Sequence, residues 1–229
     1  MKNEQLFVSE IFGPTFQGEG RSLGMPCMFL RLGGCNLACT WCDTPYTWDW
    51  LRFDPRQEVQ ALSLDEVHAR LEGGGVRNLV VSGGEPMLQQ AALLRLTRRL
   101  HEEGWWTEME TAGTIAPATA DLVRAYTVSP KLASSGNLGR PRLVHEALCA
   151  LRDTGRASWK FVVTGPEDFS EIDALVRELG LGPVYIMPEG TEAEALKARL
   201  IEMAPLCAAR GYHLTPRLHI LLYGNRRGV

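Results

Sequence analysis

Short apolar runs alternate with helix-like segments along most of the chain, and this alternation constrains the fold more than any other feature. Several of the runs are continuously apolar, as in parallel strands that are buried on both faces. Eight complete βα units need about 250 residues, and this chain has 229. We therefore predict an α/β fold, an incomplete TIM-like barrel of about six βα units, in one domain over residues 1–229. The predicted strands lie at residues 6–12, 27–33, 77–83, 105–111, 126–130, 159–163, 183–187 and 219–224.

Helix signals are readable between these strands. Ser63 and Glu66 predict a capping box, and the segment 86–104 has proline at its start and glycine at its end. Thr191 and Glu194 predict the start of the last long helix. Strands followed by helices imply right-handed βα crossovers.

Four motifs lie at the C-terminal ends of predicted strands. They are SGGEP, METAG, VSPK and MPEG, at residues 82–86, 109–113, 128–131 and 187–190. Active sites of βα folds lie where the strands end. We therefore expect these motifs to line one site.

The composition excludes several classes of function. The 24 basic and 27 acidic residues give a net charge of −3, and no long basic run is present, so we expect no nucleic-acid partner. No apolar stretch approaches the ~20 residues of a membrane span, and the N-terminus has no signal-peptide core, so we expect a cytoplasmic protein without a membrane partner. In that compartment the six cysteines are expected to be metal ligands or buried thiols.

Three of the cysteines lie within eight residues, with the spacing Cys35-x3-Cys39-x2-Cys42. A structural zinc site usually uses two pairs of ligands, and no second pair follows at a zinc-finger interval. A [4Fe–4S] cluster on three thiolates explains the odd number, because its fourth iron remains open to an external ligand. An open zinc site, or three unrelated cysteines, are the alternative interpretations.

This spacing, with the aromatic Trp41 before the last cysteine, resembles the signature of the radical S-adenosylmethionine (SAM) superfamily. SGGEP resembles the glycine-rich stretch that meets SAM in that superfamily. The resemblance implies a [4Fe–4S] cluster on Cys35, Cys39 and Cys42, whose open iron chelates SAM and whose electron cleaves it to a 5′-deoxyadenosyl radical. It also implies a flavodoxin- or ferredoxin-type electron donor.

Three further stretches resemble the 7-carboxy-7-deazaguanine synthase family. They are EIFGPTFQGEG at 10–20, FLRLGGCNLACTWCDT at 29–44 and SPK at 129–131. The resemblance implies a SAM- and Mg²⁺-dependent ring contraction of 6-carboxy-5,6,7,8-tetrahydropterin to 7-carboxy-7-deazaguanine, with release of ammonia, in 7-deazapurine (queuosine) biosynthesis. It also implies a homodimer.

The same resemblance implies roles for single residues, none of them a catalytic acid or base. Thr44 is expected to bind Mg²⁺, which prefers oxygen donors. Arg31 is expected to fork onto the substrate carboxylate, and we infer that Glu19 holds the aminopyrimidine edge. The predicted substrate-binding residues are Phe16, Gln17, Gly18, Glu19, Arg31, Ser82, His219 and Asn225. The predicted SAM-binding residues are Gly84, Glu85, Glu110, Ser129, Pro130, Lys131, Met187, Pro188, Glu189 and Gly190, of which the last four depart from the Gln-Pro-containing strand end that is more usual in the family.

Two other functions stay open at this point. A radical SAM activase, which makes a glycyl radical on a partner protein, would share the cysteine spacing and the glycine motif, but would not be expected to carry FQGEG or the Asp-Thr after the last cysteine. A small iron–sulfur or zinc protein used for binding or electron transfer is the non-enzyme alternative.

Overall fold

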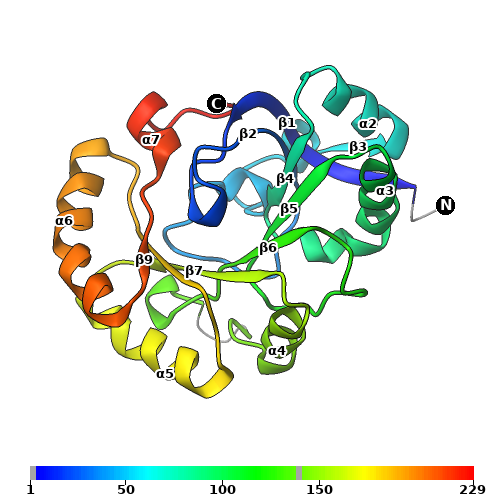
Figure 1. Ribbon diagram of the computed structural model, residues 1–229. Coiled ribbons are helices and arrows are strands. Elements are labelled where there is room, and N and C mark those ends of the chain that lie inside the picture. Colours follow the sequence, from blue (N-terminus) through cyan, green and yellow to red (C-terminus); the bar gives the residue numbers. More distant parts are fainter. Residues whose placement is uncertain (1–3, 138–140) are drawn as a thin grey trace.

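The computed structural model describes residues 4–137 and 141–229 (Figure 1). Within these residues, nine strands form one sheet in the order β3-β1-β2-β4-β5-β6-β7-β8-β9. β1 runs antiparallel to β2 and β3, and every other neighbouring pair is parallel. The strands are β1 (Gln5–Phe16), β2 (Pro26–Leu32), β3 (Gln60–Ser63), β4 (Asn78–Gly83), β5 (Trp106–Thr111), β6 (Ala125–Val128), β7 (Ala157–Val163), β8 (Val184–Pro188) and β9 (His213–Leu214).

Helices cover the outer face of the curved parallel sheet, and the sheet does not close (Figure 1). This arrangement confirms the predicted incomplete barrel. No helix in the described part of the chain is long and apolar enough to cross a membrane. The helices are α1 (Pro55–Glu58), α2 (Leu64–Glu72), α3 (Gln90–Glu102), α4 (His145–Asp153), α5 (Phe169–Leu179), α6 (Ala193–Arg210) and α7 (Leu218–Tyr223).

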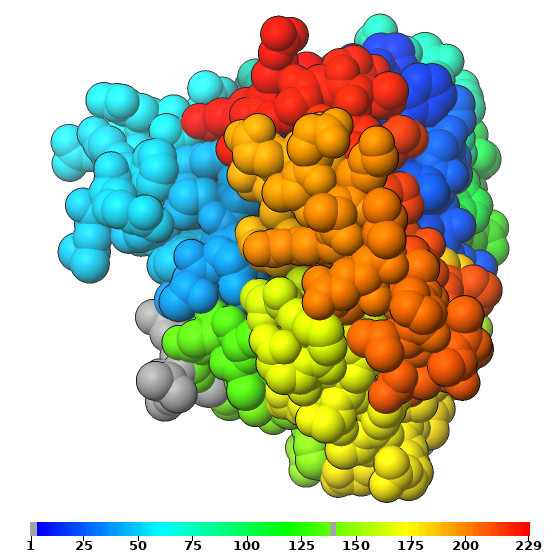
Figure 2. Space-filling model, turned by 90° about the vertical axis from the view of Figure 1, so that its left-hand side faces the viewer, coloured from blue at the N-terminus to red at the C-terminus, as the bar shows by residue number. Residues whose placement is uncertain are grey.

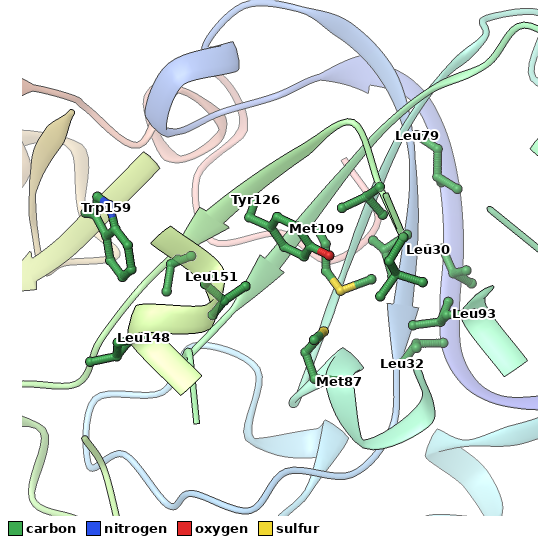
Figure 3. Close-up of a cluster of buried hydrophobic side chains, with 14 of the residues drawn as sticks. Leu30, Leu32, Leu79, Met87, Leu93, Met109, Tyr126, Leu148, Leu151 and Trp159 are labelled. Carbon is green, nitrogen blue, oxygen red and sulfur yellow. The ribbon is translucent and has the colours of Figure 1, made fainter. Parts of the chain in front are cut away.

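Alternate residues of the strands face opposite environments, as a period of two requires. On the outer face, Met109, Tyr126 and Trp159 gather with Leu148 and Leu151 of α4 in a continuous apolar core (Figure 3). The inner face is largely polar and becomes the site described below. Burial of the outer face stabilises the barrel at about 25 cal/mol per Å² of apolar surface.

Two local predictions are wrong. The run at 219–224 is not a strand: Leu218–Tyr223 forms α7, and the last strand, β9, has only two residues. Pro216 follows β9 closely, and proline cannot donate a ladder hydrogen bond. α6 starts after Glu192 with no side-chain cap bond, so Thr191 and Glu194 do not cap it. The Ser63–Glu66 capping box is confirmed.

The open side of the barrel is covered by the loop between β1 and β2 together with the segment 215–219. The Gly20 N–H donates to Thr215 Oγ1 at 2.9 Å, and the Leu218 N–H donates to the Gly18 carbonyl at 2.8 Å. A β-carbon at Gly18 would lie 2.4 Å from His219 Nδ1. Any larger residue at Gly18 would have to displace the His219 ring, so glycine lets the two segments approach this closely.

Candidate active site

One cavity of about 230 Å³ opens at the carboxyl ends of the parallel strands. It brings together segments from the whole length of the chain. Its lining includes all three clustered cysteines, Thr44 and the eight predicted substrate-binding residues: Cys35, Cys39, Cys42, Thr44, Phe16, Gln17, Gly18, Glu19, Arg31, Ser82, His219 and Asn225.

Each clustered cysteine has a nitrogen donor directed at its sulfur. The Leu37 N–H lies 3.4 Å from Cys35 Sγ. The side chains of Asn137 and Trp48 donate to Cys39 Sγ at 3.2 Å and to Cys42 Sγ at 3.3 Å. Donors of this kind stabilise thiolates and adjust the potential of a cluster bound to them.

These cysteines fit a three-thiolate cluster. All six cysteines of the chain are free, and the three in the cavity are the only cysteines among its described lining residues. Burial raises the pKa of the Cys35 thiol to about 12, so a metal must displace its proton. Nitrogen donors already placed at all three sulfurs favour the deprotonated form that iron binds.

Thr44 lines the cavity, and the turn that follows it does not use its hydroxyl. Its hydroxyl makes no cap bond to the 3-10 turn that follows, since the Thr47 hydroxyl and N–H bind the Thr44 carbonyl instead. Thr44 Oγ1 lies 3.7 Å from Cys42 Sγ. The Thr44 hydroxyl therefore does not cap the turn that follows it.

Gly83 ends β4 and packs against Leu32 of β2, and Gly84 packs directly against the cysteine loop. Gly83 has φ +144°, and a β-carbon at Gly84 would lie 2.1 Å from the Gly34 carbonyl oxygen. The Glu85 N–H donates to that same oxygen at 2.8 Å. The absence of a side chain at Gly84 thus allows the loop that carries Cys35 to pack against the end of β4.

Glu85 braces the site from outside the cavity. Its fully buried carboxylate accepts hydrogen bonds from the N–H groups of Met87 (3.0 Å) and Ala112 (2.8 Å) and from the Thr111 hydroxyl (2.8 Å). Burial raises the pKa of Glu85. The carboxylate ties the SGGEP turn to the end of β5 and does not line the cavity, so direct SAM contact by this side chain is not supported.

The other predicted SAM residues divide into two groups. Lys131 Nζ donates to Ser129 Oγ at 2.9 Å and lies 5.6 Å from the centre of the Trp41 ring. The residues of the set that line the cavity are Gly84, Glu110, Ser129, Lys131, Met187 and Glu189. The remaining ones, Pro130, Pro188 and Gly190 as well as Glu85, do not line it.

A buried charge network crosses the interior of the barrel. Lys160 and Arg217 both bind the Glu19 carboxylate, and Arg217 also binds Asp43 and, at 2.7 Å, the Gly190 carbonyl. Burial alone would raise the pKa of Glu19, but the charges of Lys160 and Arg217 outweigh it and hold that pKa well below its usual range. Burial would lower the pKa of Lys160, which its carboxylate neighbours instead raise.

This network bears on the predicted contact between Glu19 and the aminopyrimidine edge of the substrate. Both oxygens of the Glu19 carboxylate are bound by cations of the protein. Glu19 could therefore bind the aminopyrimidine edge of the substrate only if its ion pair with Lys160 or Arg217 were broken. Glu110 is placed differently: its oxygens accept from Gln17 Nε2 at 3.1 Å and Ser82 Oγ at 2.7 Å. Glu110 thereby orients two predicted substrate-binding side chains.

His219, predicted from the tail, reaches the cavity from α7. Its Nε2 lies 3.4 Å from Arg217 Nη2. Burial lowers the pKa of His219, so the ring stays neutral near pH 7.

Arg31 is held on the neighbouring wall. Its Nε donates to Glu10 Oε2 at 2.9 Å, and Tyr46 donates its hydroxyl to the same oxygen at 3.0 Å. The guanidinium also lies 5.6 Å from the centre of the Phe12 ring. Arg31 is thus fixed by a single nitrogen.

The sequence did not single out Lys160, Arg217, Tyr46 or Arg227, all of which line the cavity. Lys160 carries the one available signal, a lysine between the apolar residues of a predicted buried strand. Arg217 and Arg227 carry none, because their carboxylate partners lie more than 160 positions away in the sequence.

Comparisons with known proteins agree with this geometry. Residues 30–179 match the family model described as the radical SAM superfamily. The chain is 34% identical to a 7-carboxy-7-deazaguanine synthase of Rhodopirellula baltica, over 98% of this chain and 89% of the relative. It is 37% identical to the protein of the same name from Halobacterium salinarum, over 95% of this chain and 90% of that one.

A solved structure gives the same result. The crystal structure of QueE from Escherichia coli matches with a TM-score of 0.74 and 29% identity, covering 94% of this chain and 95% of that one. The fold and the cysteine site define a radical SAM protein, a class that implies a [4Fe–4S] cluster and SAM. Within that class, the chain belongs to the 7-carboxy-7-deazaguanine synthase family.

Proposed function

We propose that this chain is a 7-carboxy-7-deazaguanine synthase, a radical SAM lyase that converts 6-carboxy-5,6,7,8-tetrahydropterin to 7-carboxy-7-deazaguanine with loss of ammonia. The observation that carries the proposal is the convergence in one cavity of the three cysteines, Thr44 and the predicted substrate residues. Neither alternative function requires FQGEG and Asp-Thr to meet at such a site.

The cluster ligands would be Cys35, Cys39 and Cys42. When bound, the cluster and SAM supply the radical that starts and ends the ring contraction. The protein positions the reactants and excludes water. Lys131 and Ser129, beside the shielding ring of Trp41, would contact SAM.

The substrate would lie between the polar inner face of the strands and the covering loop. Arg31 would fork onto its carboxylate, with Gln17 and Ser82 held toward it by Glu110. Glu19, paired with Lys160 and Arg217, would keep the covering loop in place and is assigned a positioning role.

Mg²⁺ would bind at Thr44, with substrate oxygens and water completing its shell. Asp43 lies beside it, but its carboxylate is bound by Arg217. We therefore assign Asp43 to the support of the loop. A one-electron donor of the flavodoxin or ferredoxin type and a homodimeric assembly complete the proposal, and a reducing compartment such as the cytoplasm suits six free cysteines.

The test is anaerobic reconstitution followed by turnover. The reconstituted chain should bind about four irons and show a broad absorption near ~400 nm. With SAM, a reductant, Mg²⁺ and 6-carboxytetrahydropterin it should release 7-carboxy-7-deazaguanine and ammonia. Zinc without iron in the purified protein would reject the radical SAM assignment, and slow deoxyadenosine release without any deazapurine would favour the activase.

A further inference from the structure

The C-terminal tail is fixed to the rim of the cavity by one arginine. Arg227 Nε donates to Glu10 Oε1 at 3.0 Å, and its Nη2 donates to Glu58 Oε2 at 2.9 Å. Its guanidinium also lies 3.6 Å from the centre of the Tyr46 ring, a cation–π contact. Figure 2 shows the tail, in red, lying between α6, in orange, and the protruding cyan segment that contains α1.

Glu10 connects this arginine to Arg31. One oxygen of Glu10 accepts from Arg227, while the other accepts from Arg31 Nε at 2.9 Å and from the Tyr46 hydroxyl at 3.0 Å. The carboxylate is therefore fixed from both sides. Three side chains, from β2, the loop after the cysteines and the tail, meet at this carboxylate of β1.

Because Arg31 and Arg227 bind different oxygens of Glu10, the two Nη nitrogens of Arg31 stay available. Arg31 binds Glu10 through Nε alone, and within the described part of the chain its two Nη nitrogens have no hydrogen-bond partner. Paired Nη nitrogens are the fork that recognises a carboxylate. If Glu10 Oε1 lost Arg227, the Glu10 carboxylate could take a second bond from Arg31 and occupy one side of that fork.

We propose that Arg227 is a positioning residue for Arg31: by holding Glu10 Oε1, it keeps the Arg31 fork free for the carboxylate of the substrate. The inference rests on the proposed function, because it takes Arg31 as the group that binds the pterin carboxylate. It assigns the tail a part in substrate discrimination, and it predicts that carboxylated and uncarboxylated pterins respond differently to the same substitution.

The test measures binding to the reconstituted protein with SAM and Mg²⁺ present. The ligands are 6-carboxypterin and pterin, and the readout is the dissociation constant from calorimetry. Arg227→Gln is expected to raise the dissociation constant of 6-carboxypterin about tenfold, the scale of one charge-assisted hydrogen bond. The dissociation constant of pterin should change by less than about twofold. Arg227→Lys keeps the charge but not the two-pronged contact, so most of the loss should remain.

A matched control is available on the outer helices. Arg99 also bridges two carboxylates, Asp65 and Glu103, and its side chain is 45% exposed compared with 48% for Arg227. Arg99→Gln should leave both dissociation constants unchanged. Both arginines are exposed enough for their loss to be tolerated by the fold.

The outcomes separate the inference from the function. If the unmodified protein binds both pterins equally, the carboxylate-binding role of Arg31 fails, and the proposed function with it. If it prefers 6-carboxypterin and Arg227→Gln keeps the full preference, the inference is overturned. In the double variant Arg31→Gln/Arg227→Gln, we expect no loss beyond that of Arg31→Gln alone, and additive losses would also overturn it.

Discussion

Replacing Lys160 with methionine should destabilise the protein more than removing its partner Glu19. The side chains are 7% and 12% exposed, so this ion pair is shielded from solvent. The surrounding network has three carboxylates, on Glu19, Glu110 and Asp43, and two cations, on Lys160 and Arg217. Without Lys160, the three carboxylates share one cation, and two of them, Glu19 and Glu110, are largely shielded from solvent.

The expected magnitude follows from this imbalance. Breaking a buried pair by removing one partner costs about 3–5 kcal/mol, and in a chain of this length about 1 kcal/mol shifts the melting temperature by roughly 2–4 °C. Lys160→Met should therefore lower the melting temperature by about 6–20 °C. Glu19→Gln leaves two carboxylates facing two cations, so its loss should be smaller.

Thermal unfolding of four proteins tests the ordering: the unmodified chain, Lys160→Met, Glu19→Gln and the double variant. Adding Glu19→Gln to Lys160→Met should recover part of the stability, because it removes an unpaired carboxylate. Arg95→Gln, at an exposed pair with Glu4, is the control and should cost less than about 1 kcal/mol. Equal losses in both single variants, or a double variant that is the sum of the two, would refute the charge-balance reasoning.

The direction in which pH changes the stability of the fold follows from the pKa shifts of Glu19 and Lys160. The pKa of Glu19 is lower in the folded protein than its ordinary 4.5, so its contribution is present above that pH and is lost as the pH falls. The pKa of Lys160 is raised above 10.5, so its contribution is present below that pH and is lost as the pH rises through the folded value. The stability difference between the unmodified protein and Glu19→Gln should be constant from about pH 5 to 10 and shrink in acid.

Four further changes have defined outcomes at the cluster and its loop. Cys39→Ala should abolish iron binding and turnover, and activity in this variant would reject the cluster assignment. Thr44→Ala should weaken the dependence of the rate on Mg²⁺ while the iron content stays normal; an unchanged Mg²⁺ titration would remove Thr44 from the metal site. Gly84→Ala places a methyl group 2.1 Å from the Gly34 carbonyl, so the cysteine loop must move, and iron retention should fall; full iron content would contradict this. Trp48→Phe removes the N–H donor at Cys42 Sγ and should make the cluster potential more negative in a redox titration, with a steady potential arguing against the bond.

The strands that carry the site were predictable because their signals are local. Parallel strands buried on both faces read as apolar runs, and seven of the eight predicted runs are strands of the sheet. The run at 219–224 failed because a short apolar stretch fits a helix as well as a strand. The two-residue β9 is too short for any periodicity to reveal.

The predictable part of the site is the part written as motifs. Cys35, Cys39 and Cys42 carry their own spacing, and all three line the cavity. Glu85 shows the limit of such reasoning. Its place in SGGEP suggested a contact with SAM, whereas its carboxylate accepts hydrogen bonds from buried backbone N–H groups and a hydroxyl. A motif fixes which residues occur together but not the direction in which each side chain points.

Arg217 shows why the other residues of the site could not be predicted from the sequence. It joins three segments that are separate in the sequence: the loop after β1 through Glu19, the cysteine loop through Asp43, and the end of β8 through the Gly190 carbonyl. The sheet leaves this side of the barrel open, so no strand ladder can connect these segments, and a planar guanidinium with five donors makes the connection instead. The cavity wall on this side therefore depends on the C-terminal segment, and residues 215–227 belong to the site as fully as the cysteine loop does.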